Sequence, residues 1–169
     1  MLFRSNGVAA GKQVFLDAIT NSAVFHYSGH SVDASDPLRS SILLDGDHEG
    51  PNGITALDVS QRHMRPNSVV VLASCDSSVG NSRDGVGMRG LTSAFLISGA
   101  GSVVGSLWLV ETNATSQLVI GFHKAFTSGT SVAQSLRQTQ LAFIRSASPR
   151  SRPYYWSGFV VTGNVSALR

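Results

Sequence analysis

The feature that most constrains the fold is an alternation of short apolar runs with longer segments of helical periodicity. Four runs, each bounded by glycine, serine or asparagine, predict short buried strands: Ala23–Tyr27, Val69–Ala73, Ser102–Leu107 and Phe159–Thr162. Elsewhere, apolar residues recur at intervals of three and four and predict helices over Ala9–Ile19, Thr55–His63, Leu91–Ser98, Thr115–Thr127 and Ser131–Ile144. Continuously apolar strands are typical of parallel sheets that are covered on both faces. The sequence therefore predicts a layered α/β fold around a mostly parallel central sheet.

Two polar segments are too long to be simple connections between these elements. Ser31–Asn52 surrounds a small apolar island, Ile42–Leu44, which is consistent with a β-hairpin. Asp76–Arg89 is almost free of apolar residues and contains several glycines. Long loops at one edge of a sheet often carry functional residues, so we expect both segments to lie at a functional edge.

Composition favours a single folded domain over residues 1–169. With 42% hydrophobic and 14% charged residues, the chain is too apolar to be disordered. The net charge of +3 comes mostly from scattered basic residues, and the one cluster, Arg145–Arg152, has the serine and proline content of a solvated surface loop. No apolar run is long enough to span a membrane, and no signal-peptide pattern is present. A single cysteine excludes an internal disulfide and fits a reducing compartment, so we expect a cytoplasmic protein. From the scattered charge and the lack of long apolar runs we expect no nucleic-acid and no membrane partner.

Reactive side chains follow two of the predicted strands. The stretch Phe25–His30 ends in a histidine, and Val69–Asp76 contains Cys75, the only cysteine. Ligands bind at the carboxyl ends of strands in open α/β sheets. Either residue alone is most often structural or a plain surface group, but an imidazole beside a thiol can take its proton and create a thiolate nucleophile. If the two strands are adjacent and parallel, His30 and Cys75 converge.

A metal site is a weaker interpretation of the same region. His26 lies four residues before His30 and would share its face of a strand, so a zinc site with Cys75 would need a further ligand from residues 45–48. A spacing of four is typical of zinc ligands on helices rather than on strands. We therefore interpret His26 as a hydrogen-bonded interior histidine and expect no metal.

The run Gly85–Gly90 matches the dinucleotide-binding pattern G-x-G-x-x-G, and Glu111 follows about twenty residues later, as a ribose-binding acid would. However, roughly ten polar residues separate this run from the strand that ends at Ala73, whereas a true fingerprint follows its strand directly. The glycines are therefore predicted to be loop hinges and a helix start. No cofactor is expected, and nucleotide binding is kept as a third alternative.

Large aromatic side chains lie near the ends of the last two strands. Trp108 follows the run that ends at Leu107, and Tyr154, Tyr155 and Trp156 precede the final strand. Packing is the favoured explanation for all four. The alternative for Trp108 is that it borders a substrate cleft, because aromatic residues at strand ends also line such clefts.

Five motifs occur in a fixed order along the chain: His26–His30, Leu72–Ser77, Gly90–Ala100, Ser106–Val110 and Pro153–Phe159. Together they resemble the CHAT domain, a caspase-like family often found beside tetratricopeptide repeats, over a region from Gly7 to Asn164. The resemblance implies a caspase-like three-layer α/β sandwich and hydrolysis of peptide bonds by a His/Cys dyad. Carried over to this chain, the catalytic roles fall on His30 and Cys75.

The resemblance also implies an oxyanion hole formed by backbone N–H groups of the cysteine and of a glycine beside the histidine. In this chain Gly29 precedes His30, and Ser31 stands where a following glycine is usual. The expected oxyanion donors are therefore Gly29, Ser31 and Cys75. CHAT domains usually contain further strands and helices before the matching segment, so this chain is expected to be the C-terminal part of a larger domain.

The leading functional hypothesis is a cysteine endopeptidase that cleaves a protein or peptide substrate in a regulated signalling or defence context. Asp76 and Asp84 lie near the expected site and would favour a basic P1 side chain, although surface solvation explains each of them more simply. Tetratricopeptide repeats or another sensor domain are expected upstream. The alternative is a non-catalytic, caspase-like interaction module within a larger sensor protein.

Overall fold

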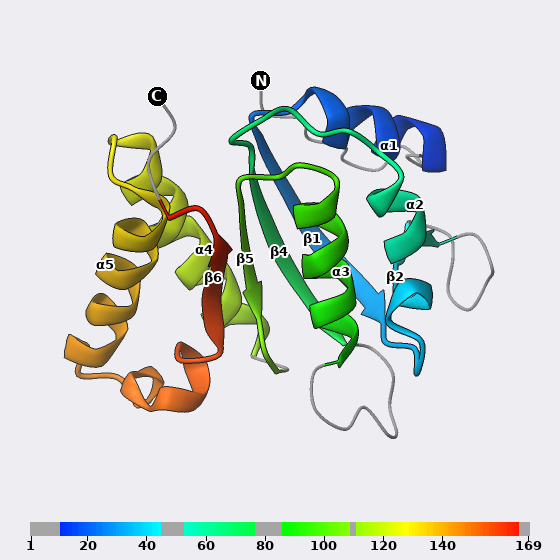
Figure 1. Cartoon of the computed structure of the whole chain (residues 1–169). Helices are drawn as coiled ribbons and strands as arrows, with labels where there is room; N and C mark the ends of the chain where they lie inside the picture. Colours follow the sequence, from blue (N-terminus) through cyan, green and yellow to red (C-terminus); the bar gives the residue numbers. More distant parts are fainter. Residues whose placement is uncertain (1–10, 45–52, 77–85, 109–110, 166–169) are drawn as a thin grey trace.

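A six-stranded sheet lies between two layers of helices in the computed structural model, which describes residues 11–44, 53–76, 86–108 and 111–165 (Figure 1). The strands are β1 (Val24–Val32), β2 (Ser41–Ile42), β3 (Ile54–Thr55), β4 (Val69–Asp76), β5 (Ser102–Ser106) and β6 (Phe159–Gly163). The helices are α1 (Lys12–Asn21), α2 (Ala56–Ser60), α3 (Val86–Ile97), α4 (Thr112–Thr127) and α5 (Val132–Arg145), with short 3-10 helices at Pro37–Arg39, Pro149–Ser151 and Pro153–Tyr155. The predicted layered α/β architecture is confirmed.

The strand order is β3-β2-β1-β4-β5-β6. The central strands β1, β4 and β5 are parallel neighbours, whereas β2 joins β1, β3 joins β2 and β6 joins β5 by antiparallel pairing. The chain adds strands on one side of β1 first and then returns to add β4 on its other side. The order therefore reverses between β1 and β4, and such a reversal is where open α/β sheets form their ligand sites.

Successive residues of β4 point to opposite faces of the sheet, and their apolar side chains are buried on both faces. Val70 and Leu72 pack with α1, α2 and α3 on what we call the α1–α3 face. Val69 and Val71 pack with α4 and α5 on the opposite, α4–α5 face. Burial of each such side chain contributes roughly 1.5–3 kcal/mol. This two-sided burial explains why the strand has no polar alternation in its sequence.

Side-chain caps fix several of the helix starts. Thr55 and Asp58 form a capping box at the start of α2, and Ser131 accepts a hydrogen bond from the Gln134 N–H at the start of α5. The Glu111 carboxylate accepts hydrogen bonds from the first N–H groups of α4. These groups would otherwise have no partner inside the helix. Glu111 is thus a helix cap, which accounts for its position without a ribose ligand.

The two strands that carry the candidate residues are longer than predicted. β1 continues past Tyr27 to Val32, and β4 continues past Ala73 to Asp76. The extension arises because β1 has a partner on each side there, β4 on one and β2 on the other. The island at Ile42 supplies β2, which pairs with β3 at Ile54–Thr55, beyond the segment Ser31–Asn52 in which a hairpin was predicted. Among the described residues, no helix is both long enough and apolar enough to cross a membrane.

Candidate active site

His30 and Cys75 are direct partners in the β1–β4 ladder. The parallel register runs from Val24↔Val69 to Ser31↔Asp76 and pairs the Cα of His30 with that of Cys75. Both positions lie at the carboxyl ends of their strands, next to the point where the strand order reverses. The condition for the predicted convergence, two adjacent parallel strands, is therefore met.

The expectation that both residues follow the ends of their strands is wrong. His30 and Cys75 lie within β1 and β4, and the neighbouring positions Gly29 and Ser31 are paired with Ser74 and Asp76. Ser31 is also paired with Ile42 of β2 and is buried. Hydrogen bonding to two neighbouring strands keeps this part of the chain extended, although its polar sequence is typical of a loop. The sheet, rather than a flexible loop, positions the expected oxyanion residues.

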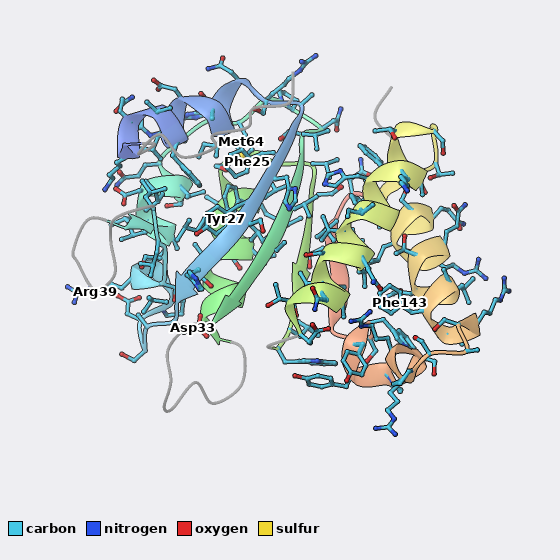
Figure 2. The ribbon with its side chains drawn as sticks, turned by 180° about the vertical axis from the view of Figure 1, so that it is seen from behind. Phe25, Tyr27, Asp33, Arg39, Met64 and Phe143 are labelled. Carbon is cyan, nitrogen blue, oxygen red and sulfur yellow. The ribbon has the colours of Figure 1, made fainter. Side chains whose placement is uncertain are left out.

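His30 is exposed at this sheet edge, and its backbone is held on the side of β2. The His30 carbonyl accepts a hydrogen bond from the Leu43 N–H at 2.9 Å. The Tyr27 hydroxyl lies 2.7 Å from the same carbonyl oxygen and 2.6 Å from the Leu43 carbonyl oxygen. Figure 2 shows Tyr27 and Phe25 on β1, with α1 and Asp33 at opposite ends of the strand. Sequence reasoning did not identify Tyr27 as a functional residue.

A second histidine lies next to His26 in the fold. The rings of His26 in β1 and His123 in α4 have centroids 5.0 Å apart. The Nε2 atoms of both are buried and have no hydrogen-bond partner among the described residues. His26 is thus partly buried, and among the described residues its Nε2 lacks the hydrogen bond that was predicted. Packing of α4 across β1 supplies an aromatic neighbour instead.

Burial changes the protonation of this pair. Desolvation, followed by the charge of His123, lowers the pKa of His26 to about 4. Desolvation also lowers the pKa of His123. Burial removes the water that would solvate a charged imidazolium, and no hydrogen bond to Nε2 from the described residues replaces it, so the neutral form is favoured. Both rings are therefore neutral at physiological pH, and their contact is apolar packing.

The described residues provide no group of three or more His, Cys, Asp or Glu side chains that is placed to hold a metal ion. The segment 45–48, which the zinc interpretation would need, lies outside the described residues. So do Gly85 and Asp84. Gly87 and Gly90 belong to α3, and a Cβ on Gly90 would lie 2.4 Å from the Pro37 carbonyl oxygen. Close packing of α3 against the 3-10 helix Pro37–Arg39 explains Gly90.

Trp108 lies two residues beyond β5 and is 42% exposed. Its indole N–H donates to the Tyr154 carbonyl, and its ring covers Gly158 so closely that a Cβ there would be 2.7 Å away. In Figure 1 the orange segment that contains Tyr154 lies at the same end of the sheet as the carboxyl end of β5. Trp108 is thus a partly exposed aromatic residue at the edge of the sheet that carries His30.

The comparison with protein families finds the CHAT domain over residues 5–164. Tetratricopeptide repeat protein 28 of Homo sapiens is 29% identical over 136 residues, which is 80% of this chain and 5% of that protein. Its Mus musculus counterpart is 29% identical over 111 residues, 66% of this chain and 4% of that protein. The chain therefore spans only about a twentieth of the length of these relatives.

Solved structures share the fold at low sequence identity. A chain in the crystal structure of the Saccharomyces cerevisiae separase–securin complex at 2.6 Å aligns with a TM-score of 0.61 and 15% identity, covering 94% of this chain and 10% of that one. The 3.0 Å structure of the complex gives a TM-score of 0.57 and 17% identity, covering 91% and 9%. These similarities concern the fold alone. With a family match across nearly its whole length and this caspase-like architecture, the chain belongs to the CHAT domain family.

Proposed function

We propose that this chain carries the catalytic centre of a cysteine endopeptidase, with Cys75 as the nucleophile and His30 as its general acid and base. The observation that carries the proposal is the pairing of the two Cα positions on adjacent parallel strands. Register partners occupy the same face of a pleated sheet, which is the arrangement that a thiol and its base need.

The proposed reaction has two steps. His30 accepts the Cys75 thiol proton, and the resulting thiolate adds to the carbonyl carbon of a peptide bond. The C–N bond then breaks, His30 gives the proton to the leaving amine, and a thioester remains on Cys75. In the second step His30 takes a proton from water, the hydroxide equivalent attacks the thioester, and the carboxylic acid product leaves as the thiol is restored.

Backbone N–H groups at Gly29, Ser31 and Cys75 are the proposed donors to the oxyanion in both steps. Trp108 is the proposed wall of the substrate cleft, supported by its partial exposure at the same edge of the sheet. The basic P1 preference expected from Asp76 and Asp84 stays a prediction. An upstream tetratricopeptide array is part of the same proposal, since the curated relatives are tetratricopeptide repeat proteins. A cytoplasmic location is proposed with it, because a single cysteine fits a reducing compartment.

The test uses the single cysteine of the chain, because any thiol label must report on Cys75. We expect a library of peptidyl chloromethyl ketones to label the wild-type chain much faster than iodoacetamide labels it, with strong dependence on the peptide sequence. His30→Ala should slow peptidyl labelling by roughly 10²–10⁴-fold, the usual contribution of a general acid–base group. Peptide cleavage by the wild-type chain, and its loss in Cys75→Ala, completes the test.

Gln61→Ala is the matched control for His30→Ala, because Gln61 is exposed at the end of α2 and belongs to neither β1 nor β4. Equal labelling by peptidyl and simple electrophiles would contradict the peptidase, and so would labelling that is unchanged in His30→Ala.

The second candidate is a non-catalytic interaction module. It is favoured by the names of the curated relatives, since tetratricopeptide repeats stack into extended surfaces that bind other proteins. This function predicts a wild-type chain whose Cys75 reacts no faster than a free thiol. It also predicts binding of partner proteins that Cys75→Ala leaves unchanged.

A further inference from the structure

The Tyr27 hydroxyl lies between two backbone carbonyls, that of His30 and that of Leu43. Its oxygen lies 2.7 Å from the His30 carbonyl oxygen and 2.6 Å from that of Leu43. A phenol has one proton to donate, so the hydroxyl can serve either carbonyl but not both at once. The Leu43 N–H already donates to the His30 carbonyl. The hydroxyl therefore reinforces the junction between β1 and the residue that follows β2.

The ring of Tyr27 reaches this junction by crossing Gly29. A Cβ on Gly29 would lie 2.4 Å from the Tyr27 hydroxyl oxygen and 2.7 Å from the ring carbon that bears it. Atoms do not approach so closely, so only glycine at position 29 allows this path. The absence of a side chain at Gly29 thus has a steric reason that is separate from any role in an oxyanion hole.

The ring is also held from the side of α1. Phe15 contacts Tyr27 edge to face, with centroids 6.1 Å apart, and contacts Phe25 in the same way at 5.1 Å. Burial raises the pKa of Tyr27, against the opposing effect of its hydrogen bond to the His30 carbonyl, so the phenol keeps its proton and remains a donor. Figure 2 shows Tyr27 on the part of β1 between Phe25 and Asp33.

We infer that Tyr27 is a positioning residue for His30. By fixing the His30 peptide against Leu43, the hydroxyl sets the direction in which the Cα–Cβ bond of His30 leaves the strand. This inference rests on the proposed function, because it assigns Tyr27 a role in aligning the imidazole with the Cys75 thiol. A pairing of imidazole and thiol is sensitive to small displacements, since proton transfer needs hydrogen-bond distance.

The experiment measures the rate at which iodoacetamide alkylates Cys75 between pH 5 and 9. An aligned histidine lowers the apparent pKa of the thiol, whereas a free thiol titrates near 8.5. We expect Tyr27→Phe to move the alkylation profile toward that of a free thiol. Once the thiol pKa exceeds 6.5, the rate at pH 6.5 should fall by roughly three- to tenfold for each further unit, because the thiolate fraction falls tenfold while the remaining thiolate becomes more reactive. Gly29→Ala keeps the hydroxyl but displaces the ring, so its profile should move in the same direction.

Thr139→Val is the matched control. It deletes a buried hydroxyl that donates to a backbone carbonyl, that of Ser135, but within α5 on the opposite face of the sheet. Its profile should coincide with that of the wild type even where its thermal stability is lower.

The outcomes separate the two proposals. If His30→Ala leaves the wild-type profile unchanged, the dyad itself fails, and the role of Tyr27 fails with it. If His30→Ala moves the profile and Tyr27→Phe does not, the dyad stands and the positioning role is overturned. Loss of folding in Tyr27→Phe, judged by circular dichroism, would also overturn it, because the hydroxyl would then serve general stability.

Discussion

The two faces of the sheet bury ionisable side chains in opposite ways. On the α1–α3 face the Tyr27 hydroxyl is within hydrogen-bond distance of two carbonyls. On the α4–α5 face, His26 and His123 pack ring against ring, and their buried Nε2 atoms have no hydrogen-bond partner among the described residues. Both arrangements begin on the same strand, β1, within four residues of His30.

The difference shows how two neighbouring residues of one strand come to have different hydrogen bonding and different helices as neighbours. Successive residues of β1 point to opposite faces, so Tyr27 and His26 meet different helices although they adjoin in sequence. The bonded phenol adds order at the carboxyl end of β1. The two imidazoles, whose Nε2 atoms lack hydrogen bonds among the described residues, contribute apolar packing at neutral pH. At acidic pH their protonation destabilises the folded state. The α4–α5 face is therefore expected to be the acid-sensitive one, and the following predictions test that contrast.

The largest expected effect tests whether the two faces are equally well packed. Phe95 in α3 and Phe122 in α4 are each fully buried, one in each cluster. We expect Phe95→Ala and Phe122→Ala to lower the free energy of unfolding by about 3–5 kcal/mol each, because both remove apolar burial and leave a cavity. Urea unfolding at neutral pH measures this. A cost below about 1 kcal/mol for one variant alone would show that its face is loosely packed.

The second prediction concerns acid. Because burial holds the pKa of His26 near 4, below the value of about 6.5 in an unfolded chain, the unfolded state binds more protons between these values. The stability is therefore fully present above about pH 6.5 and falls as the pH is lowered toward 4. The slope for each histidine cannot exceed about 1.4 kcal/mol per pH unit, and partial exposure reduces it.

Unfolding by urea at several pH values between 4.5 and 7.5 measures this slope. His26→Leu and His123→Leu should each flatten it, whereas Tyr27→Phe on the other face should leave it as in the wild type. An unchanged slope in both histidine variants would contradict the contrast between the faces.

The smallest effects are expected from the ion pairs that lie outside the two clusters. Lys12 and Asp58 join α1 to α2 at 2.8 Å, and Arg150 and Glu111 join the 3-10 helix Pro149–Ser151 to the start of α4 at 3.5 Å. Lys12→Met should cost less than about 1 kcal/mol, because the pair is partly exposed and Asp58 keeps its bonds to Thr55. Arg150→Met should have a smaller effect still. Thermal unfolding at low and high salt checks both, and an effect of Lys12→Met that salt does not reduce would argue against a screened surface pair.

The elements themselves were largely predictable from local pattern. The helix expected over Ser131–Ile144 is α5, Val132–Arg145, and the helix expected over Thr115–Thr127 is α4 with three more residues at its start. The strand expected over Phe159–Thr162 is β6, but it runs antiparallel to its neighbour. The five CHAT-like motifs led to the family that the comparison confirms.

What the sequence determined by itself was thus the periodicity of each segment, and with it the α/β class and the two apolar runs that lead to His30 and Cys75. The tertiary structure decided how far β1 and β4 extend, because their last residues stay extended only through pairing with each other and with β2. It also decided that Tyr27 lies against Leu43 and that His26 lies against His123. A local pattern reports which face a residue prefers; it contains no information about which distant residue will lie on that face, since that depends on strand order and helix packing across the whole chain.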